Sequence, residues 1–129
     1  MRFTSLLLAV ALAPNSVLIA ADKLNESQAI REIKRLGGTI KRDEKSVGRP
    51  VTAVRFSQNR SFRDKDLVLL KTLKSLAILQ LSFTHITDAG LNDLREFKNL
   101  THLGLKDTQL TNAGLQELRQ SLPNVNIER

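Results

Sequence analysis

The sequence predicts an α/β fold in which short parallel strands alternate with helices and stack into a small solenoid. Compared with itself at a shift of 24 residues, the stretch from Leu76 matches the stretch from Leu100. A period of this length is typical of stacked supersecondary units. Within each copy, apolar residues spaced by two precede apolar residues spaced by three, which indicates one strand followed by one helix. Stacked units of this kind form a parallel sheet with helices on its convex side.

The strand and the helix can be placed from the apolar spacing in the first clear copy. Leu79 and Leu81 have the period of a strand with one buried face. Leu91, Leu94 and Phe97 recur every three residues, as expected for a helix with one apolar stripe. Leu103 and Leu105, and then Leu115 and Leu118, repeat these spacings 24 residues later, so each copy contributes one strand and one helix.

The residues around each expected helix start are typical of a cap. Thr87 and Thr111 stand where an N-cap is needed. Gly90 and Gly114 reduce helix propensity, and we expect them to permit close approach to the neighbouring unit. A degenerate copy with a strand over 54–56 precedes the clear ones, and a truncated copy over 122–127 follows. The degenerate copy lacks the capping threonine, so Asp64 is expected to cap there.

The segment between the N-terminus and the copies has a different pattern. Leu24, Ile30, Ile33 and Leu36 fit one face of a helix, which the glycine pair at 37–38 ends. Residues 39–42 and 51–56 are predicted strands, joined by a polar connection over 43–50. A helix and hairpin here would cover the open end of the apolar core, which a repeat array requires. Residues 22–50 are therefore expected to form an N-terminal α-β-β cap on the repeats of residues 51–129.

The first 21 residues are typical of a secretory signal peptide. Arg2 precedes the apolar run over 6–13, and small residues follow at Ala20 and Ala21. The run is shorter than the roughly 20 apolar residues that span a bilayer. We therefore expect export to the periplasm or the exterior, with membrane contact only through this segment; retention as a short anchor is the alternative.

Composition limits the chemistry that this chain of 129 residues can perform. The absence of Cys excludes disulfides, thiolate metal sites and a cysteine nucleophile. His85 and His102 fall at different positions of the period, and neither has a metal-ligand spacing to a second histidine. No phosphate-binding loop or nucleophile motif occurs. We expect no enzyme activity, no metal and no cofactor.

The motif T-x-I-T-D-A-G-L, carried by residues 84–91, resembles that of the leucine-rich repeat family. The similar subtype is common in secreted bacterial proteins and is related to ribonuclease-inhibitor-like repeats. The resemblance covers residues 51–127, with two clear and two partial repeats. Thr84 and Thr108 occupy a position where many family members carry Asn or Cys, and their hydroxyls can serve the same turn. The resemblance implies non-catalytic binding of a protein or glycan partner on the concave sheet face.

The outward-facing neighbours of the strand leucines form rows across the expected sheet. One row is Ala53, Ile78, His102 and Asn126, and the next is Arg55, Gln80, Gly104 and Glu128. Phe83 follows a strand at the rim, where an aromatic side chain is a candidate binding hot spot or packs locally over the turn. The candidate partner-binding residues are Arg55, Ser57, Ile78, Gln80, Ser82, Phe83, His102, Gly104 and Lys106.

The net charge, the last strand and the repeat resemblance each leave another function open. The chain has a net charge of +7, and residues 22–66 carry 12 Lys and Arg against seven Asp and Glu. An anion-binding envelope protein acting through this basic cap is one alternative. The free edge of the last strand makes a self-associating structural protein another. Repeat resemblance alone suggests a ligase-receptor-like or inhibitor-like adaptor. Nucleic acid is not expected, because aromatic residues are not interleaved with the basic ones.

Overall fold

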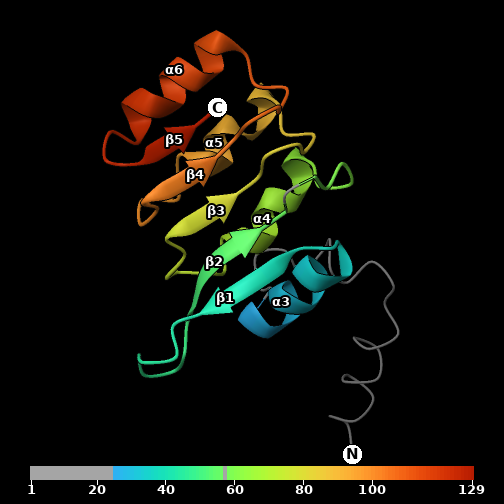
Figure 1. Ribbon diagram of the computed structural model, residues 1–129, viewed down its shortest axis with the longest axis vertical. Helices are drawn as coiled ribbons and strands as arrows, with labels where there is room; N and C mark the ends of the chain where they lie inside the picture. Colours follow the sequence, from blue (N-terminus) through green and yellow to red (C-terminus); the bar gives the residue numbers. More distant parts are fainter. Residues whose placement is uncertain (1–24, 57) are drawn as a thin grey trace, which may run out of the picture.

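The computed structural model describes residues 25–56 and 58–129, which form an α/β fold around one five-stranded sheet. The strands follow the order β1-β2-β3-β4-β5 (Figure 1). β1 pairs antiparallel with β2, and every later pair is parallel. The α/β class predicted from the sequence is confirmed. The expected signal peptide over 1–21 lies outside the described residues.

The first described helix and strand agree with the pattern of residues 22–50. Helix α3 spans Glu26–Arg35 and strand β1 spans Thr39–Arg42. Asn25 caps the helix: its side chain accepts a hydrogen bond from the Gln28 backbone N–H at 2.8 Å, and the Gln28 side chain accepts one from the Asn25 N–H at 3.2 Å. Gly37 ends the helix with a φ of 85°, which favours glycine.

The remaining strands are short and register directly with one another. They are β2 at Val51–Arg55, β3 at Ile78–Gln80, β4 at His102–Gly104 and β5 at Asn126–Glu128. Val54 pairs with Leu79, and Leu79 pairs with Leu103. The buried side chains of successive strands therefore lie side by side.

The helical segments differ along the chain. A 3-10 turn at Asp64–Asp66 leads into α4 at Leu67–Leu70, and a 3-10 turn at Asp88–Gly90 leads into α5 at Leu91–Leu94. The last helix, α6 at Asn112–Ser121, is α-helical throughout. Each helix packs against the next one, from α3 to α6, and together they form a layer on one side of the sheet.

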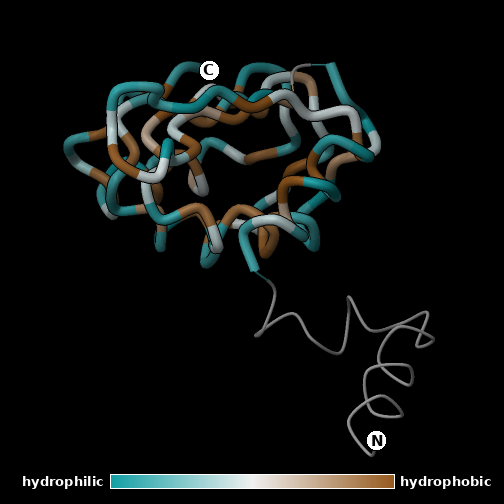
Figure 2. Tube along the Cα trace, turned by 90° about the horizontal axis from the view of Figure 1, so that it is seen from below, coloured by the Kyte–Doolittle hydropathy of each residue, from teal (hydrophilic) through white to brown (hydrophobic). Residues whose placement is uncertain are grey.

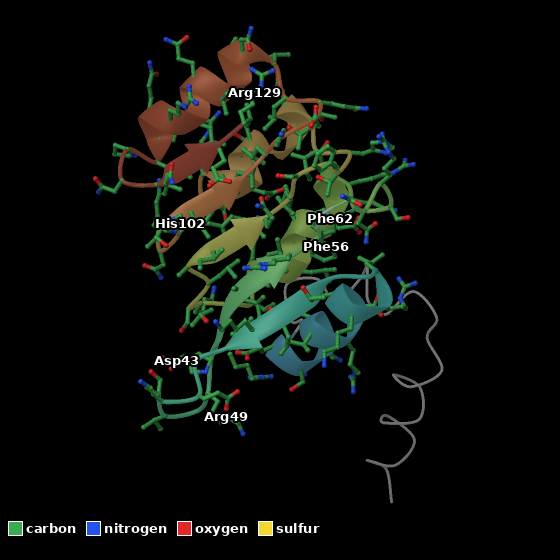
Figure 3. All side chains as sticks on the ribbon, viewed as in Figure 1. Asp43, Arg49, Phe56, Phe62, His102 and Arg129 are labelled. Carbon is green, nitrogen blue, oxygen red and sulfur yellow. The ribbon has the colours of Figure 1, made fainter. Side chains whose placement is uncertain are left out.

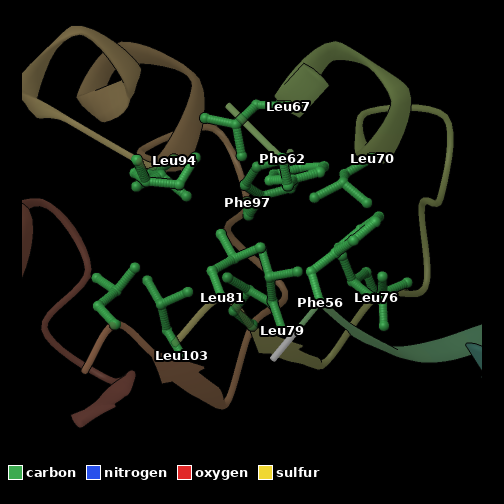
Figure 4. Packing of buried hydrophobic residues seen from close by; sticks show 14 of the residues in the cluster. Phe56, Phe62, Leu67, Leu70, Leu76, Leu79, Leu81, Leu94, Phe97 and Leu103 are labelled. Atoms are coloured by element: carbon green, nitrogen blue, oxygen red, sulfur yellow. The ribbon is translucent and has the colours of Figure 1, made fainter. Parts of the chain in front are cut away.

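The hydrophobic core lies between the helix layer and the sheet. Leu79, Leu81 and Leu103 extend from the sheet toward Leu67 and Leu94 of the helix layer (Figure 4). Seen from below, apolar stretches recur in both layers of the chain (Figure 2). The core continues under the first helix, because Ile30 and Ile33 belong to the same buried cluster.

Hydrogen bonds between carboxylates and threonines join successive units on the helix side. Asp64 accepts from the backbone N–H of Thr87 at 2.9 Å and from its hydroxyl at 2.6 Å. Asp88 accepts in the same way from Thr111, at 3.0 and 2.6 Å. The expectation that Asp64 caps its own helix is therefore wrong. Asp66 serves that turn instead, because its side chain accepts a hydrogen bond from the backbone N–H of Arg63 at 3.0 Å.

The carboxylates of Asp64 and Asp88 explain why glycine occupies positions 90 and 114. A Cβ on Gly90 would lie 2.6 Å from Asp64 Oδ1, and a Cβ on Gly114 would overlap Asp88 Oδ1. Any larger side chain would have to displace the carboxylate of the preceding unit. The close approach expected from the sequence is thus an approach of one acidic side chain to the next helix start.

The turn after each strand is held by a side-chain hydrogen bond. The hydroxyl of Thr84 donates to the carbonyl of Leu81 at 2.6 Å, and that of Thr108 donates to the carbonyl of Leu105 at 2.9 Å. The expected role of these threonines is confirmed. In the degenerate first unit, Asn59 replaces threonine, and its amide donates to a carbonyl at the end of α3.

The packing predicts opposite sensitivities for two adjacent residues of β3. Leu79 is 1% exposed and Ile78 is 38% exposed. Leu79→Ala should lower the free energy of unfolding by about 2–5 kcal/mol, because it leaves a cavity. Ile78→Ala should cost about 1 kcal/mol or less. Urea denaturation of both variants measures the difference, and equal losses would contradict the assignment of the two strand faces.

The carboxylate–glycine contact predicts coupling between two residues of different units. Gly114→Ala should lower the melting temperature, because its methyl group displaces the Asp88 carboxylate. In the Asp88→Ala background the same change should cost less, since the obstructing group is gone. A double-mutant cycle by thermal denaturation measures the coupling. Additive losses would show that the contact does not constrain residue 114.

The Asp88 hydrogen bonds also predict a pH dependence of stability. Hydrogen bonds from the hydroxyl and N–H of Thr111 lower the pKa of Asp88. A carboxyl with a lower pKa in the folded state stabilises the fold above its unfolded pKa, about 3.9, and this contribution is lost as pH falls through the folded pKa. Asp88→Asn should therefore be less stable than the native chain at pH 7, and the difference should shrink below about pH 4. Urea denaturation at pH 7 and pH 3 tests this, and a constant difference would contradict it.

Candidate binding surface

The side of the sheet opposite the core is exposed and carries mostly polar side chains. Because Val54, Leu79 and Leu103 point into the core, their strand neighbours point the other way. We call this surface the outer sheet face. It comprises Thr39, Lys41, Ala53, Arg55, Ile78, Gln80, His102, Gly104, Asn126 and Glu128.

The first row of the outer sheet face has the register expected from the sequence. Ala53 pairs with Ile78, Ile78 with His102, and His102 with Asn126. Ile78 and His102 are exposed, whereas Ala53 is buried. His102 lies at the start of β4 (Figure 3). The row continues onto β1, where Lys41 pairs with Ala53. Sequence reasoning missed Lys41 as a member of this row, although pairing the two strands of the hairpin would have placed it there.

The second row keeps its expected register, but one member is covered. Arg55 pairs with Gln80, and Gln80 pairs with Gly104. Gly104 is buried, because the Gln80 side chain lies over it and fills the space that a Cβ would need. The expectation that Gly104 faces a partner is therefore wrong, and Gln80 presents the surface at this point.

Ser82 is also buried rather than exposed. Its hydroxyl donates to Gln80 Oε1 at 3.1 Å and accepts from the backbone N–H of Lys106 at 3.2 Å. Ser82 therefore positions the Gln80 side chain and the backbone that follows β4. The expectation that Ser82 contacts a partner is corrected, because its hydroxyl is already bonded and buried. Lys106 itself is exposed, and the candidate Ser57 lies outside the described residues.

Phe83 lies at the rim of the outer sheet face in a left-handed backbone conformation. Its φ is 62°, and the residues at the equivalent turns, Gln58 and Asp107, have φ values of 63° and 52°. Bulky residues rarely adopt this conformation. Phe83 is half-buried, and its N–H donates to the carbonyl of Lys106 at 2.7 Å. This backbone hydrogen bond to the neighbouring turn therefore holds Phe83 in a conformation that its bulky side chain disfavours.

The charge of the outer sheet face changes from one end to the other. Lys41 and Arg55 are exposed on the first two strands, and Lys106 is exposed after β4. Within the described part of the chain, none of the three forms an ion pair with a carboxylate. The one carboxylate of the two rows, Glu128, is on β5. The end formed by β1 and β2 is therefore basic.

Three other basic side chains near the N-terminus form ion pairs. Ion pairs join Arg35 to Glu32 at 2.8 Å and Arg42 to Glu26 at 3.8 Å. The connection between β1 and β2 (Figure 3) holds a further pair between Arg49 and Glu44. Exposed basic residues without such a pair among the described side chains include Arg31 and Lys34 of α3, which lie in the helix layer.

Two hollows lie away from the outer sheet face. The smaller, of about 120 Å³, is lined partly by Lys71 and Glu96. Hydrogen bonds to Asp93 and Glu96, together with their negative charge, raise the pKa of Lys71, so it stays protonated as an ion-pair partner. The larger is an open depression of about 410 Å³ lined by residues that include His85. Its carboxylate, Asp64, is already engaged in the bonds that join the units.

The larger hollow is also lined by Thr87, whose hydroxyl donates to Asp64 at 2.6 Å as part of the bonds that join the units. Among residues 25–56 and 58–129, no three His, Asp or Glu side chains are placed to hold a metal ion. In the same part of the chain, no helix has both the length and the apolar character needed to cross a bilayer. The outer sheet face is consequently the best-defined candidate surface.

The sequence of this chain matches no protein-family model, and no curated protein sequence matches it. Function is therefore inferred from the residues themselves. The relevant features are the period of the sequence, the open face of the sheet and the charges that this face carries.

Proposed function

We propose that this chain is an exported, non-catalytic recognition protein that binds a protein or glycan partner through its outer sheet face. In this proposal the chain is a short leucine-rich-repeat solenoid, and the outer sheet face is its concave surface. Residues 1–21 direct export to the periplasm or exterior, and residues 22–50 cap the repeats of residues 51–129.

The solenoid proposal is supported by contacts that recur at nearly constant spacing. Strand order follows chain order from β1 to β5. The bonds from Thr87 to Asp64 and from Thr111 to Asp88 each span 23 residues. Contacts confined to neighbouring units are the property that defines repeat architectures. The antiparallel β1 and α3 fit the role of a cap, because they pack on the first unit and are not built from the repeated sequence.

The observation that carries the binding proposal is the open sheet face. Helices pack only on the core side of the described sheet, so the opposite side presents its rows to solvent. Ile78 is exposed at the centre of this face, with His102 beside it and Arg55 on the neighbouring strand. An apolar side chain surrounded by polar and charged groups is a common composition for a binding patch.

A capture experiment with three baits tests the proposal. The first is the native chain. The second carries Arg55→Ala, Ile78→Ala and Lys106→Ala on and beside the outer sheet face. The third is a matched control on the helix layer, with Arg31→Ala and Lys34→Ala. We expect one component of a cell-envelope extract to be retained by the first and third baits and lost from the second, with mass spectrometry identifying it.

Two outcomes would overturn the proposal. Equal retention by all three baits would mean that the outer sheet face does not bind the component. Loss from the third bait but not the second, with release by salt, would assign binding to the basic helix surface, because exposed charges are screened at high salt. Circular dichroism of each bait confirms that it remains folded.

A further inference from the structure

We infer that the outer sheet face recognises an extended acidic peptide segment with one aliphatic residue. This inference rests on the proposed function and specifies the chemistry of the partner. Three observations on the described residues carry it: the basic end of the face, the exposed isoleucine at its centre, and the lack of an exposed aromatic side chain in its rows.

The charge distribution selects an acidic partner. Lys41 and Arg55 occupy neighbouring strands at one end of the face, and both are exposed. Neither has a carboxylate within 4.0 Å among the described residues. An opposite charge from a partner can therefore pair with them without breaking an existing ion pair. A basic segment would be repelled here, which gives discrimination as well as attraction.

Ile78 and the absence of aromatic groups favour a peptide over a glycan. The sequence contains no Trp or Tyr, and Phe56, Phe62 and Phe97 are buried in the core. Apart from the imidazole of His102, the two rows thus offer no ring on which a sugar could stack, and Phe83 at the rim is half-buried. Ile78 can instead pack against an aliphatic side chain. Its row neighbours are Ala53, which is small and buried, and the polar His102, so Ile78 is the apolar contact point of its row.

The strand spacing sets the distance between the acidic and aliphatic residues of the peptide. Lys41 and Ile78 belong to one row and are two strands apart. Adjacent strands are about 4.8 Å apart, so the two residues are separated by roughly 10 Å. An extended peptide advances about 3.3 Å per residue, and it covers this distance in about three residues. The acidic residue should therefore precede or follow the aliphatic one by about three positions.

Titration of the full ¹⁵N-labelled chain with capped synthetic peptides tests the inference. The acidic probe is Glu-Glu-Ala-Leu-Ala-Ala, and the matched probe replaces both glutamates with lysine. The acidic probe should shift the amide resonances of Lys41, Ile78 and His102. It should bind about tenfold more tightly than the basic probe, which is the effect of two exposed ion pairs. A third probe with serine in place of leucine should bind more weakly than the acidic one.

Two charge-reversal variants provide the matched control. Lys41→Glu should abolish the preference for the acidic probe, whereas Lys34→Glu on α3 should leave it unchanged. Vesicles of phosphatidylglycerol are titrated in parallel. Stronger shifts with vesicles than with the acidic peptide, centred on α3, would overturn the inference in favour of a lipid surface.

The remaining outcomes separate this inference from the broader proposal. If both peptides shift Ile78 and His102 equally, the acidic preference is wrong, while the outer sheet face stays a recognition surface. If neither peptide shifts these residues at millimolar concentration, the peptide inference fails. The capture experiment with the three baits then decides the proposed function independently.

Discussion

The fold depends on the inability of a 24-residue unit to bury its own apolar side chains. Strands β3 and β4 each present one leucine to the core, Leu79 and Leu103, and α4 and α5 are each a single turn of α-helix after a 3-10 turn. Neighbouring units must therefore cover one another. Backbone pairing fixes their spacing on the sheet side, and the bonds from Thr87 to Asp64 and from Thr111 to Asp88 fix it on the helix side.

The sequence period predicted the register of β2 to β5, because an apolar residue displaced by one position would turn from the core to solvent. The hydrogen bonds and contacts of individual side chains were not predicted from the period. Asp64 lies next to a helix start, as a cap would, yet it serves the following unit. Gly104 and Ser82 lie on the predicted surface by alternation, but the long Gln80 side chain covers the first and bonds to the second. Both contacts depend on the long side chain at position 80, which Arg55 and Gly104 replace on the neighbouring strands, so the period does not indicate them.

The outer sheet face combines rigidity with an uneven charge. Its side chains extend from strands that are paired on both sides, except at β1 and β5, so their relative positions are set by the backbone. Lys41 joins this face through the one antiparallel pair, which brings a residue from outside the repeated sequence beside Ala53. The expected N-terminal cap therefore does more than cover the core in our proposal, because it supplies part of the binding surface.

The sequential strand order has a consequence for how the molecule would respond to a partner. Each strand pairs only with the strands next to it in the chain, so stability is transmitted from neighbour to neighbour. A ligand lying across β1, β2, β3 and β4 would connect units that otherwise have no direct contact. Bound in this way, the ligand would hold these strands together, and local unfolding of the strand at one end would then require release of the ligand.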